Sequence, residues 1–195
     1  MNELKNVIKE SIDLKNKILD DKLFINKINI TINSITNLFR NGNKLLFCGN
    51  GGSAADAQHL AAEFSGRFYH DRDPLYSEAL HCNSSFMTAV GNDYGYEKTY
   101  SRAIKAIGNK DDILVGISTS GNSKNVINAM IEAKKKEMIC IGFTGSSGGK
   151  MKNYSDILIN VPSNNTPRIQ EAHIMIGHII CEFVEKKLFK NENIK

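Results

Sequence analysis

The 195-residue sequence predicts an α/β fold, in which a doubly wound parallel sheet of five strands is flanked by helices. Five short apolar runs alternate with amphipathic stretches of helical length. Continuous apolar strands that alternate with helices are typical of a parallel sheet covered on both faces. The predicted strands are Lys44–Cys48, Glu78–Cys82, Asp112–Ser118, Met138–Phe143 and Asp156–Val161.

Helices are predicted before and after this alternating region. Apolar side chains recur near the helical period over residues 1–41, and the sequence Asn41-Gly42-Asn43 ends that pattern. Residues 167–189 predict a long closing helix with a proline at its start. Because no repeat or linker is visible, we predict one domain over residues 1–195. It comprises N-terminal helices (1–41) and an α/β core with the closing helix (44–189).

The composition is that of an ordinary globular protein, with 41% hydrophobic residues, 24% charged residues and a formal net charge of +4. The only tight cationic run, Lys134–Lys136, is typical of a solvated helix end, so we expect no nucleic-acid partner. The four cysteines are isolated, which argues against a disulfide framework or a thiolate metal site. Neither a signal peptide nor an apolar run of about 20 residues is visible, so we expect a cytoplasmic protein without membrane contact.

The first strand is followed by a glycine-rich loop, Gly49-Asn50-Gly51-Gly52-Ser53. Glycines let backbone N–H groups approach a ligand, and the following helix N-terminus favours an anion or a polar oxygen. A tight strand-to-helix turn is the simpler interpretation. Gly49 to Ala54 also fits the dinucleotide pattern GxGxxA, but the end of the second strand, His81–Ser84, lacks the acidic residue that this pattern requires.

The third strand is followed by a loop rich in hydroxyl groups, Ser118-Thr119-Ser120-Gly121-Asn122-Ser123. Four hydroxyls and free amides at a helix N-terminus suit a phosphate monoester, whereas a structural helix cap needs only one Ser or Thr. The loop lacks the lysine of a Walker motif, which argues against nucleoside triphosphate hydrolysis.

His59 and Glu63 are four residues apart on the helix after the first loop, so both face one side of it. Such a pair can share a divalent metal, commonly zinc, but a plain surface pair has the same spacing. The closing helix carries four further candidates, of which His178 lies in an apolar stretch that also suits a core histidine. These candidates are Gln170, Glu171, His173 and His178.

Four segments resemble the successive signature blocks of the phosphoheptose isomerases, a family of the sugar isomerase (SIS) domain superfamily. They are CGNGGSAADAQHLAAEFSGRF, GNDYGYEKTYSRAIKAIG, GISTSGNSKNVINA and RIQEAHIMIGHII. The resemblance runs from about Leu45 to Glu185 in the family's order. STSGNS alone marks only the superfamily, whereas its combination with QHLAAE and RIQEAH is specific to this family. Thr166-Pro167 departs from the family pattern, which often has an acidic residue beside Arg168.

The resemblance implies a five-stranded parallel sheet and a homotetramer with active sites at subunit interfaces. It also implies one zinc ion per subunit, held by His59, Glu63, Gln170 and His178. The substrate would be a sugar phosphate. The implied substrate contacts, with Ser53 from the first loop and Arg67 added as plausible neighbours, are Asn50, Gly51, Gly52, Ser53, Glu63, Arg67, Asn92, Asp93, Ser118, Thr119, Ser120, Ser123 and Gln170.

The implied reaction converts D-sedoheptulose 7-phosphate to D-glycero-D-manno-heptose 7-phosphate through an enediol, as the first step toward ADP- or GDP-heptose for lipopolysaccharide or capsule. We predict Glu63 as the base and His178 as its acid partner. Three alternatives remain: a non-catalytic scaffold associated with the replication initiator, a regulatory SIS domain, and an isomerase for another ketose phosphate. The presence of Glu63 and His178 argues against the first two.

Overall fold

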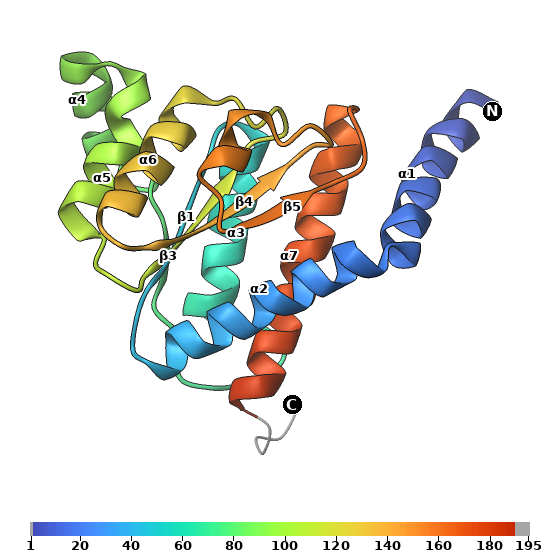
Figure 1. Cartoon of the computed structure of the whole chain (residues 1–195), viewed down its shortest axis with the longest axis horizontal. Helices are drawn as coiled ribbons and strands as arrows, with labels where there is room; N and C mark the ends of the chain where they lie inside the picture. The colour runs from blue at the N-terminus through green and yellow to red at the C-terminus, as the bar shows by residue number, and fades with distance from the viewer. Residues whose placement is uncertain (1, 190–195) are drawn as a thin grey trace.

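The computed structural model describes residues 2–189, and these form five parallel strands with helices on both sides of the sheet (Figure 1). The strand order is β2-β1-β3-β4-β5, and every neighbouring pair is parallel. The predicted α/β class and all five predicted strands are confirmed, although β2 ends at Ala79, three residues before the predicted end. The strands are β1 Leu45–Gly49, β2 Ser77–Ala79, β3 Ile113–Ile117, β4 Ile139–Thr144 and β5 Ile157–Asn160.

The helices begin and end where the local sequence favours it. Asp21 caps α2 by accepting hydrogen bonds from two backbone N–H groups, Asn83 caps α4 in the same way, and α7 has Pro167 in its first turn. The glycine-rich segment runs into α3, which starts at Gly52. The helices are α1 Asn2–Asp20, α2 Lys22–Arg40, α3 Gly52–Ser65, α4 Ser84–Tyr94, α5 Thr99–Ile107, α6 Lys124–Lys135 and α7 Thr166–Leu188, with short 3-10 helices η1 Tyr96–Lys98 and η2 Gly149–Asn153.

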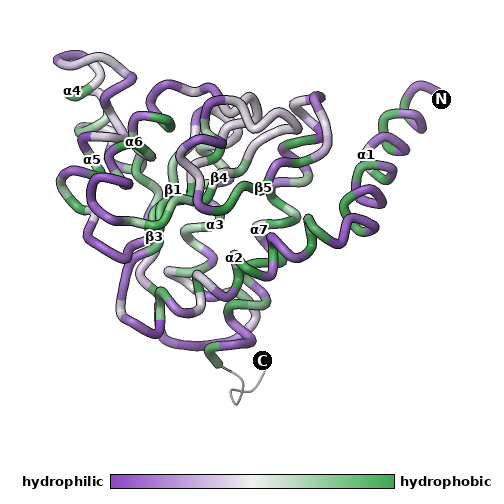
Figure 2. Tube along the Cα trace, in the orientation of Figure 1, coloured by the Kyte–Doolittle hydropathy of each residue, from purple (hydrophilic) through white to green (hydrophobic). Residues whose placement is uncertain are grey.

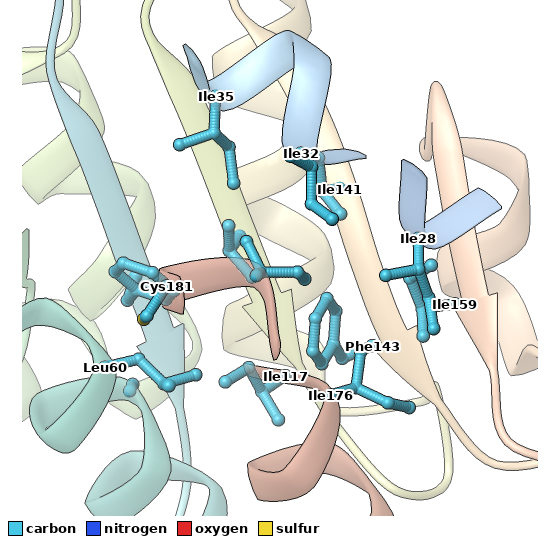
Figure 3. Packing of buried hydrophobic residues seen from close by; sticks show 14 of the residues in the cluster. Ile28, Ile32, Ile35, Leu60, Ile117, Ile141, Phe143, Ile159, Ile176 and Cys181 are labelled. Carbon is cyan, nitrogen blue, oxygen red and sulfur yellow. The ribbon is translucent and has the colours of Figure 1, made fainter. Parts of the chain in front are cut away.

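Alternating side chains of the strands feed two hydrophobic cores, one on each face of the sheet. The first core joins the sheet to α2, α3 and α7, and Figure 3 shows its central members. Phe143 of β4 lies there beside Ile176 of α7 and Ile117 of β3 (Figure 3). The second core joins the opposite face to α5 and α6. Both faces of the sheet are therefore covered, as the continuous apolar strands predicted.

The chain reverses its direction of winding between β1 and β3. It passes from β1 through α3 to β2 at one edge, and then returns to β3 on the other side of β1. Ligands of open parallel sheets bind outside the carboxyl ends of the strands at such a switch point. The loops that follow β1 and β3 are the two that the sequence marked as candidate ligand loops.

Helix α1 extends away from the sheet (Figure 1) and contacts α2 and α7, where Nη1 of Arg168 donates to the carbonyl of Val7 (2.9 Å). Only Leu14 and Ile18 of α1 are buried. Its other apolar side chains are exposed and lie among hydrophilic residues (Figure 2), namely Leu4, Val7, Ile8, Ile12 and Leu19. The helical state of this segment is confirmed, but most of its apolar side chains stay exposed within the described part of one chain.

The single domain over residues 1–195 stays a prediction, because residues 1 and 190–195 lie outside the described part of the chain. Across residues 2–189, no helix combines the length and the apolar character that a membrane span requires.

Candidate active site

The loop after β1 has a backbone geometry that depends on its glycines. Gly51 has φ +56, in the left-handed region that favours glycine. A Cβ on Gly52 would lie 2.6 Å from Nε2 of Gln170, so the absence of a side chain lets the amide of Gln170 reach the first turn of α3. Gln170 and Gly52, two of the predicted substrate contacts, are therefore brought together.

Asn50 of the same loop is held by neighbours that the sequence did not mark. Its Nδ2 donates to Oδ1 of Asn125 (2.8 Å), while its Oδ1 accepts from Nδ2 of Asn125 (2.8 Å) and from the hydroxyl of Tyr96 (2.9 Å). Tyr100 donates its hydroxyl proton to the carbonyl of Gly49, and burial raises the pKa of Tyr100. These bonds fix the loop after β1 against α5, α6 and η1.

The loop after β3 gathers the predicted hydroxyl groups at the N-terminus of α6. Oγ of Ser118 lies 2.9 Å from Oγ of Ser123 and 3.4 Å from Oγ of Ser120. Ser120 Oγ also accepts from the backbone N–H of Asn122 (3.1 Å). Hydroxyl groups this close together at a helix N-terminus can donate to several oxygens of one anion.

A hollow of about 320 Å³ opens beside this loop. The loops after β4 and β5 contribute further polar side chains to its wall, and these were missed by the sequence analysis. The rule that located the first two loops, polar residues at the carboxyl ends of parallel strands, would also have found them. The lining residues are Thr119, Ser120, Asn122, Gly145, Ser146, Ser147, Ser163, Asn164, Thr166 and Ile169.

His59, Glu63 and His178 converge where α3 passes α7. Nε2 of His59 lies 3.0 Å from Oε1 of Glu63 and 3.3 Å from Nε2 of His178. One donor atom from each of the three residues lies within 4.8 Å of the others. Ligands of a tetrahedral zinc, each about 2.0–2.1 Å from the ion, are about 3.3 Å apart. The spacing of these three side chains therefore fits a divalent ion.

Phe68 and Gly177 complete the surroundings of the cluster. The ring of Phe68 lies 5.9 Å from that of His178, centroid to centroid. Gly177 packs directly against Leu60, because a Cβ at Gly177 would lie 2.5 Å from Cδ2 of Leu60. This close approach of α7 to α3 lets the neighbouring residues His178 and His59 meet.

The other histidine of this part of α7 is a core residue. His173 is fully buried, and its Nε2 lies 3.1 Å from the carbonyl oxygen of Thr144. Burial lowers the pKa of His173 to about 4. The core environment that the apolar sequence suggested for His178 thus belongs to His173, whereas His178 is only partly buried and faces α3.

The remaining predicted site residues lie outside the His–Glu cluster and the group of serine hydroxyls. Arg67 is exposed at the end of α3. Asn92 and Asp93 are exposed near the end of α4, where Nδ2 of Asn92 donates to Oδ1 of Asp93 (2.8 Å). Ser53 is buried in the first turn of α3. Gln170 stays a prediction as the fourth metal ligand, since its amide faces Gly52 rather than the histidine pair.

The glycine-rich loop and the His–Glu cluster lie at opposite ends of α3. Ten residues separate Ser53 from Glu63, which corresponds to about 15 Å of helix. The glycine-rich loop at the start of α3 and the His–Glu cluster near its end are therefore separated within one chain. An anion-binding loop and a carboxylate with two imidazoles are nevertheless the groups that a phosphorylated substrate and a proton transfer require.

Comparison with known proteins identifies the family. The family model for the SIS domain matches residues 9–145. The phosphoheptose isomerase of Aneurinibacillus thermoaerophilus is 51% identical over 189 residues, which cover 97% of this chain and 96% of that protein. Phosphoheptose isomerase 2 of Campylobacter jejuni is 53% identical over 180 residues, covering 92% and 90%.

A solved structure agrees with these relatives. The phosphoheptose isomerase of Neisseria gonorrhoeae superimposes with a TM-score of 0.89 at 40% identity, over 95% of this chain and 98% of that one. The sequence matches extend over nearly the whole described chain, and the structural match includes the sheet, α3 and α7. The chain therefore belongs to the phosphoheptose isomerase family of SIS-domain proteins.

Proposed function

We propose that the chain is an aldose–ketose isomerase that interconverts D-sedoheptulose 7-phosphate and D-glycero-D-manno-heptose 7-phosphate. The observation that carries this proposal is the convergence of the Glu63 carboxylate with the rings of His59 and His178 in a chain of this family. The reaction needs a base at carbon, an acid at oxygen and an anchor for the phosphate. The described residues supply a candidate for each.

Glu63 acts at carbon in this proposal. Its carboxylate removes a proton from C1 of the ketose while His178 donates a proton to the carbonyl oxygen at C2, which yields the enediol. Glu63 then returns the proton to C2, and His178 accepts the proton of the O1 hydroxyl as the aldehyde forms. The step is balanced without an oxidant or reductant. Each positioned acid or base group typically contributes about 10²- to 10⁴-fold to the rate.

The hydroxyls of Ser118, Ser120 and Ser123 bind the phosphate in this proposal. Their mutual distances of 2.9 and 3.4 Å show that they share one small volume, and the N-terminus of α6 adds a favourable field for an anion. Phosphate binding remote from the reacting carbons provides energy for orienting C1 and C2. The polar wall of the neighbouring hollow provides partners for the sugar hydroxyls.

The proposal includes one zinc ion per chain, held by His59, Glu63 and His178, with Gln170 as the fourth ligand. The spacing of the first three donor atoms supports it. When bound, zinc supplies a positive charge that polarises a carbonyl group and stabilises an enediolate. Coordination also lowers the basicity of a carboxylate and occupies one ring nitrogen of His178. With the ion bound, Glu63 serves as base only when its oxygen is available to the substrate, and His178 serves as acid only through its other ring nitrogen.

We further propose a homotetramer with active sites at subunit interfaces. Two features support assembly: the exposed apolar residues of α1, and an apolar groove between α2 and α7 that includes Ile25 and Phe183. The distance along α3 between the glycine-rich loop and the cluster supports a site that a second copy completes. Sedimentation velocity tests this, since a species at the 21.7 kDa of one chain would contradict it.

Cytoplasmic location belongs to the same proposal. The four cysteines are free, and three of them are buried: Cys48, Cys140 and Cys181. Unpaired thiols are typical of proteins in a reducing compartment. In such a setting the product would supply the synthesis of ADP- or GDP-heptose.

The direct test is a coupled assay of the purified chain with sedoheptulose 7-phosphate, and with pentose and hexose ketose phosphates as controls. The proposal expects turnover of the heptulose well above that of the shorter sugars. Preferred turnover of a pentulose or hexulose phosphate would instead identify an isomerase for another ketose. Absence of turnover on every sugar, together with specific binding of a replication initiator, would favour a non-catalytic scaffold.

A further inference from the structure

A buried ion pair joins the segment after α3 to the last turns of α7. Nε of Arg72 donates to Oε1 of Glu185 at 3.0 Å, and the two side chains are 1% and 2% exposed. The residues are separated by 113 positions in the sequence. A buried ion pair often stabilises a fold no more than apolar residues of the same size, because both charges lose their water. Stability alone therefore does not account for this buried pair.

The guanidinium of Arg72 donates to three backbone carbonyl groups at the end of α3. Nη2 donates to the backbone oxygen of Glu63 (3.0 Å), and Nη1 donates to the backbone oxygens of Phe64 (2.8 Å) and Gly66 (3.1 Å). The last carbonyls of a helix have no partner within the helix, and a cation there also complements the helix dipole. Arg72 thus holds the backbone of the residue that carries the candidate base.

The carboxylate of Glu185 organises the segment that follows. It accepts from the backbone N–H groups of Phe68 (3.1 Å), Tyr69 (2.7 Å) and His70 (3.0 Å). Burial alone would raise the pKa of Glu185, but these three bonds and the bond from Arg72 outweigh it and lower the pKa. The carboxylate is therefore ionised in the folded chain, and it fixes Phe68, whose ring packs against that of His178.

The position of Glu185 on α7 links this pair to the candidate acid. Seven residues correspond to nearly two full turns, so Glu185 and His178 lie on the same face of α7. The same helix packs against α3 through Gly177, the neighbour of His178, which contacts Leu60. Two contacts thus fix how α7 crosses the end of α3. Along α7, the contact of Gly177 with Leu60 precedes the candidate acid His178, and the contact of Glu185 with Arg72 follows it.

We propose that Arg72 and Glu185 are positioning residues, whose ion pair holds Glu63 on α3 at the correct place relative to His178 on α7. The inference rests on the proposed isomerase function and adds two residues to it that do not touch the substrate. A misplacement of about 1 Å in an active site can lower the rate about 100-fold. A change in this pair should therefore reduce kcat much more than it raises KM, because the phosphate loop belongs to other elements.

The chain offers a matched control for such a test. Asp112 is also a buried carboxylate, 1% exposed, that pairs with a lysine, Lys44, and accepts from the backbone N–H groups of Lys44 (2.9 Å) and Asn109 (2.8 Å). It lies at the amino end of β3, and its partners belong to the segments before β1 and β3, not to α3 or α7. Asp112→Asn should lower the melting temperature as Glu185→Gln does, without moving the acid–base groups.

The experiment compares Glu185→Gln, Arg72→Lys and Asp112→Asn with the wild-type chain, on sedoheptulose 7-phosphate and at a temperature well below the melting temperature of each. Arg72→Lys keeps the charge and is expected to fold even if Glu185→Gln does not. We expect Arg72→Lys to lower kcat at least about tenfold with KM within about threefold, and Asp112→Asn to leave kcat within about twofold. A loss of kcat in Arg72→Lys no greater than that in Asp112→Asn would overturn the inference.

An activity-independent readout separates this inference from the isomerase proposal. Nuclear magnetic resonance of ring-labelled histidines reports the surroundings of His178, because Phe68 lies against its ring. We expect Arg72→Lys to shift the His178 signal and Asp112→Asn to leave it in place. An unmoved signal in Arg72→Lys would overturn the positioning role even if the enzyme is active. A wild-type chain that turns over no sugar phosphate, with the signal shifted as expected, would overturn the isomerase proposal instead.

Discussion

Gly177 of α7 lies so close to Leu60 of α3 that a methyl group at position 177 would stand 2.5 Å from Cδ2 of the leucine. Each residue is the immediate neighbour of a histidine of the cluster, so this contact sets how closely the histidines approach. Gly177→Ala should push α7 away from α3 and lower stability by about 1–3 kcal/mol, the usual cost of overpacking.

Thermal unfolding and kcat together test that prediction. The double variant Leu60→Ala with Gly177→Ala makes room for the new methyl group and should restore part of the activity that Gly177→Ala loses. An unchanged melting temperature and unchanged kcat in Gly177→Ala would show that the contact does not position the histidines.

Ser120→Ala combined with Ser123→Ala should mainly raise KM. A hydrogen bond to a charged group contributes about 1.5–3 kcal/mol, so loss of both should raise KM at least about tenfold. Ser101→Ala, which removes a hydroxyl that bonds only within α5 and the preceding turn, is the control. An unchanged KM, together with normal inhibition by inorganic phosphate, would place the phosphate elsewhere.

Stability should fall in mild acid because of His173. Its pKa of about 4 in the folded chain is below the ordinary value of 6.5, so the folded state favours the neutral ring. The stability that the neutral ring of His173 contributes is fully present above pH 6.5. This stability declines below pH 6.5 and is lost once the pH has fallen through about 4. Each tenfold difference in proton affinity is worth about 1.4 kcal/mol, so complete protonation would cost on the order of 3 kcal/mol.

Urea unfolding of wild type and His173→Gln at pH 7 and pH 5 measures this contribution. The glutamine retains an N–H group for the carbonyl of Thr144 but does not titrate. The wild type should lose more stability between the two pH values than the variant does. Equal losses would assign the acid sensitivity to other groups, such as Glu185, whose lowered pKa has the same sign.

Most of the fold could be predicted from the sequence because its signals are local. The five apolar runs and the helix boundaries depend on residues within a few positions of one another, and the loops after β1 and β3 follow from those boundaries. The pairing of His59 with Glu63 also follows from helical spacing. Their meeting with His178 came from the family resemblance, since no local pattern links residues 119 positions apart.

The rest of the site depends on long-range packing. Nothing near Arg72 indicates that its partner is Glu185, and nothing near Asn50 indicates Asn125 or Tyr96. The exposure of the apolar side chains of α1 could not be predicted from the sequence either, because helical periodicity indicates an apolar face without indicating what covers it.

Zinc removal should destabilise the chain. Binding to the folded form alone raises stability by about 2.7 kcal/mol when the ion is present at a hundredfold excess over Kd. A chelator should therefore lower the melting temperature of the purified chain, and His178→Ala should abolish that response. If metal analysis finds no zinc after chelator-free purification, and added zinc changes neither stability nor rate, the three residues act as a hydrogen-bonded acid–base cluster without a metal.

The most direct test of the central claim is kcat of Glu63→Gln on sedoheptulose 7-phosphate. The amide keeps the size of the side chain but cannot accept a proton from C1. The account predicts that isomerisation falls by at least about 10³-fold with the fold intact. The control Glu132→Gln, on α6 and paired with Lys105 and Lys135, should keep wild-type activity. Activity of Glu63→Gln within about tenfold of wild type would contradict the assignment of Glu63 as the base.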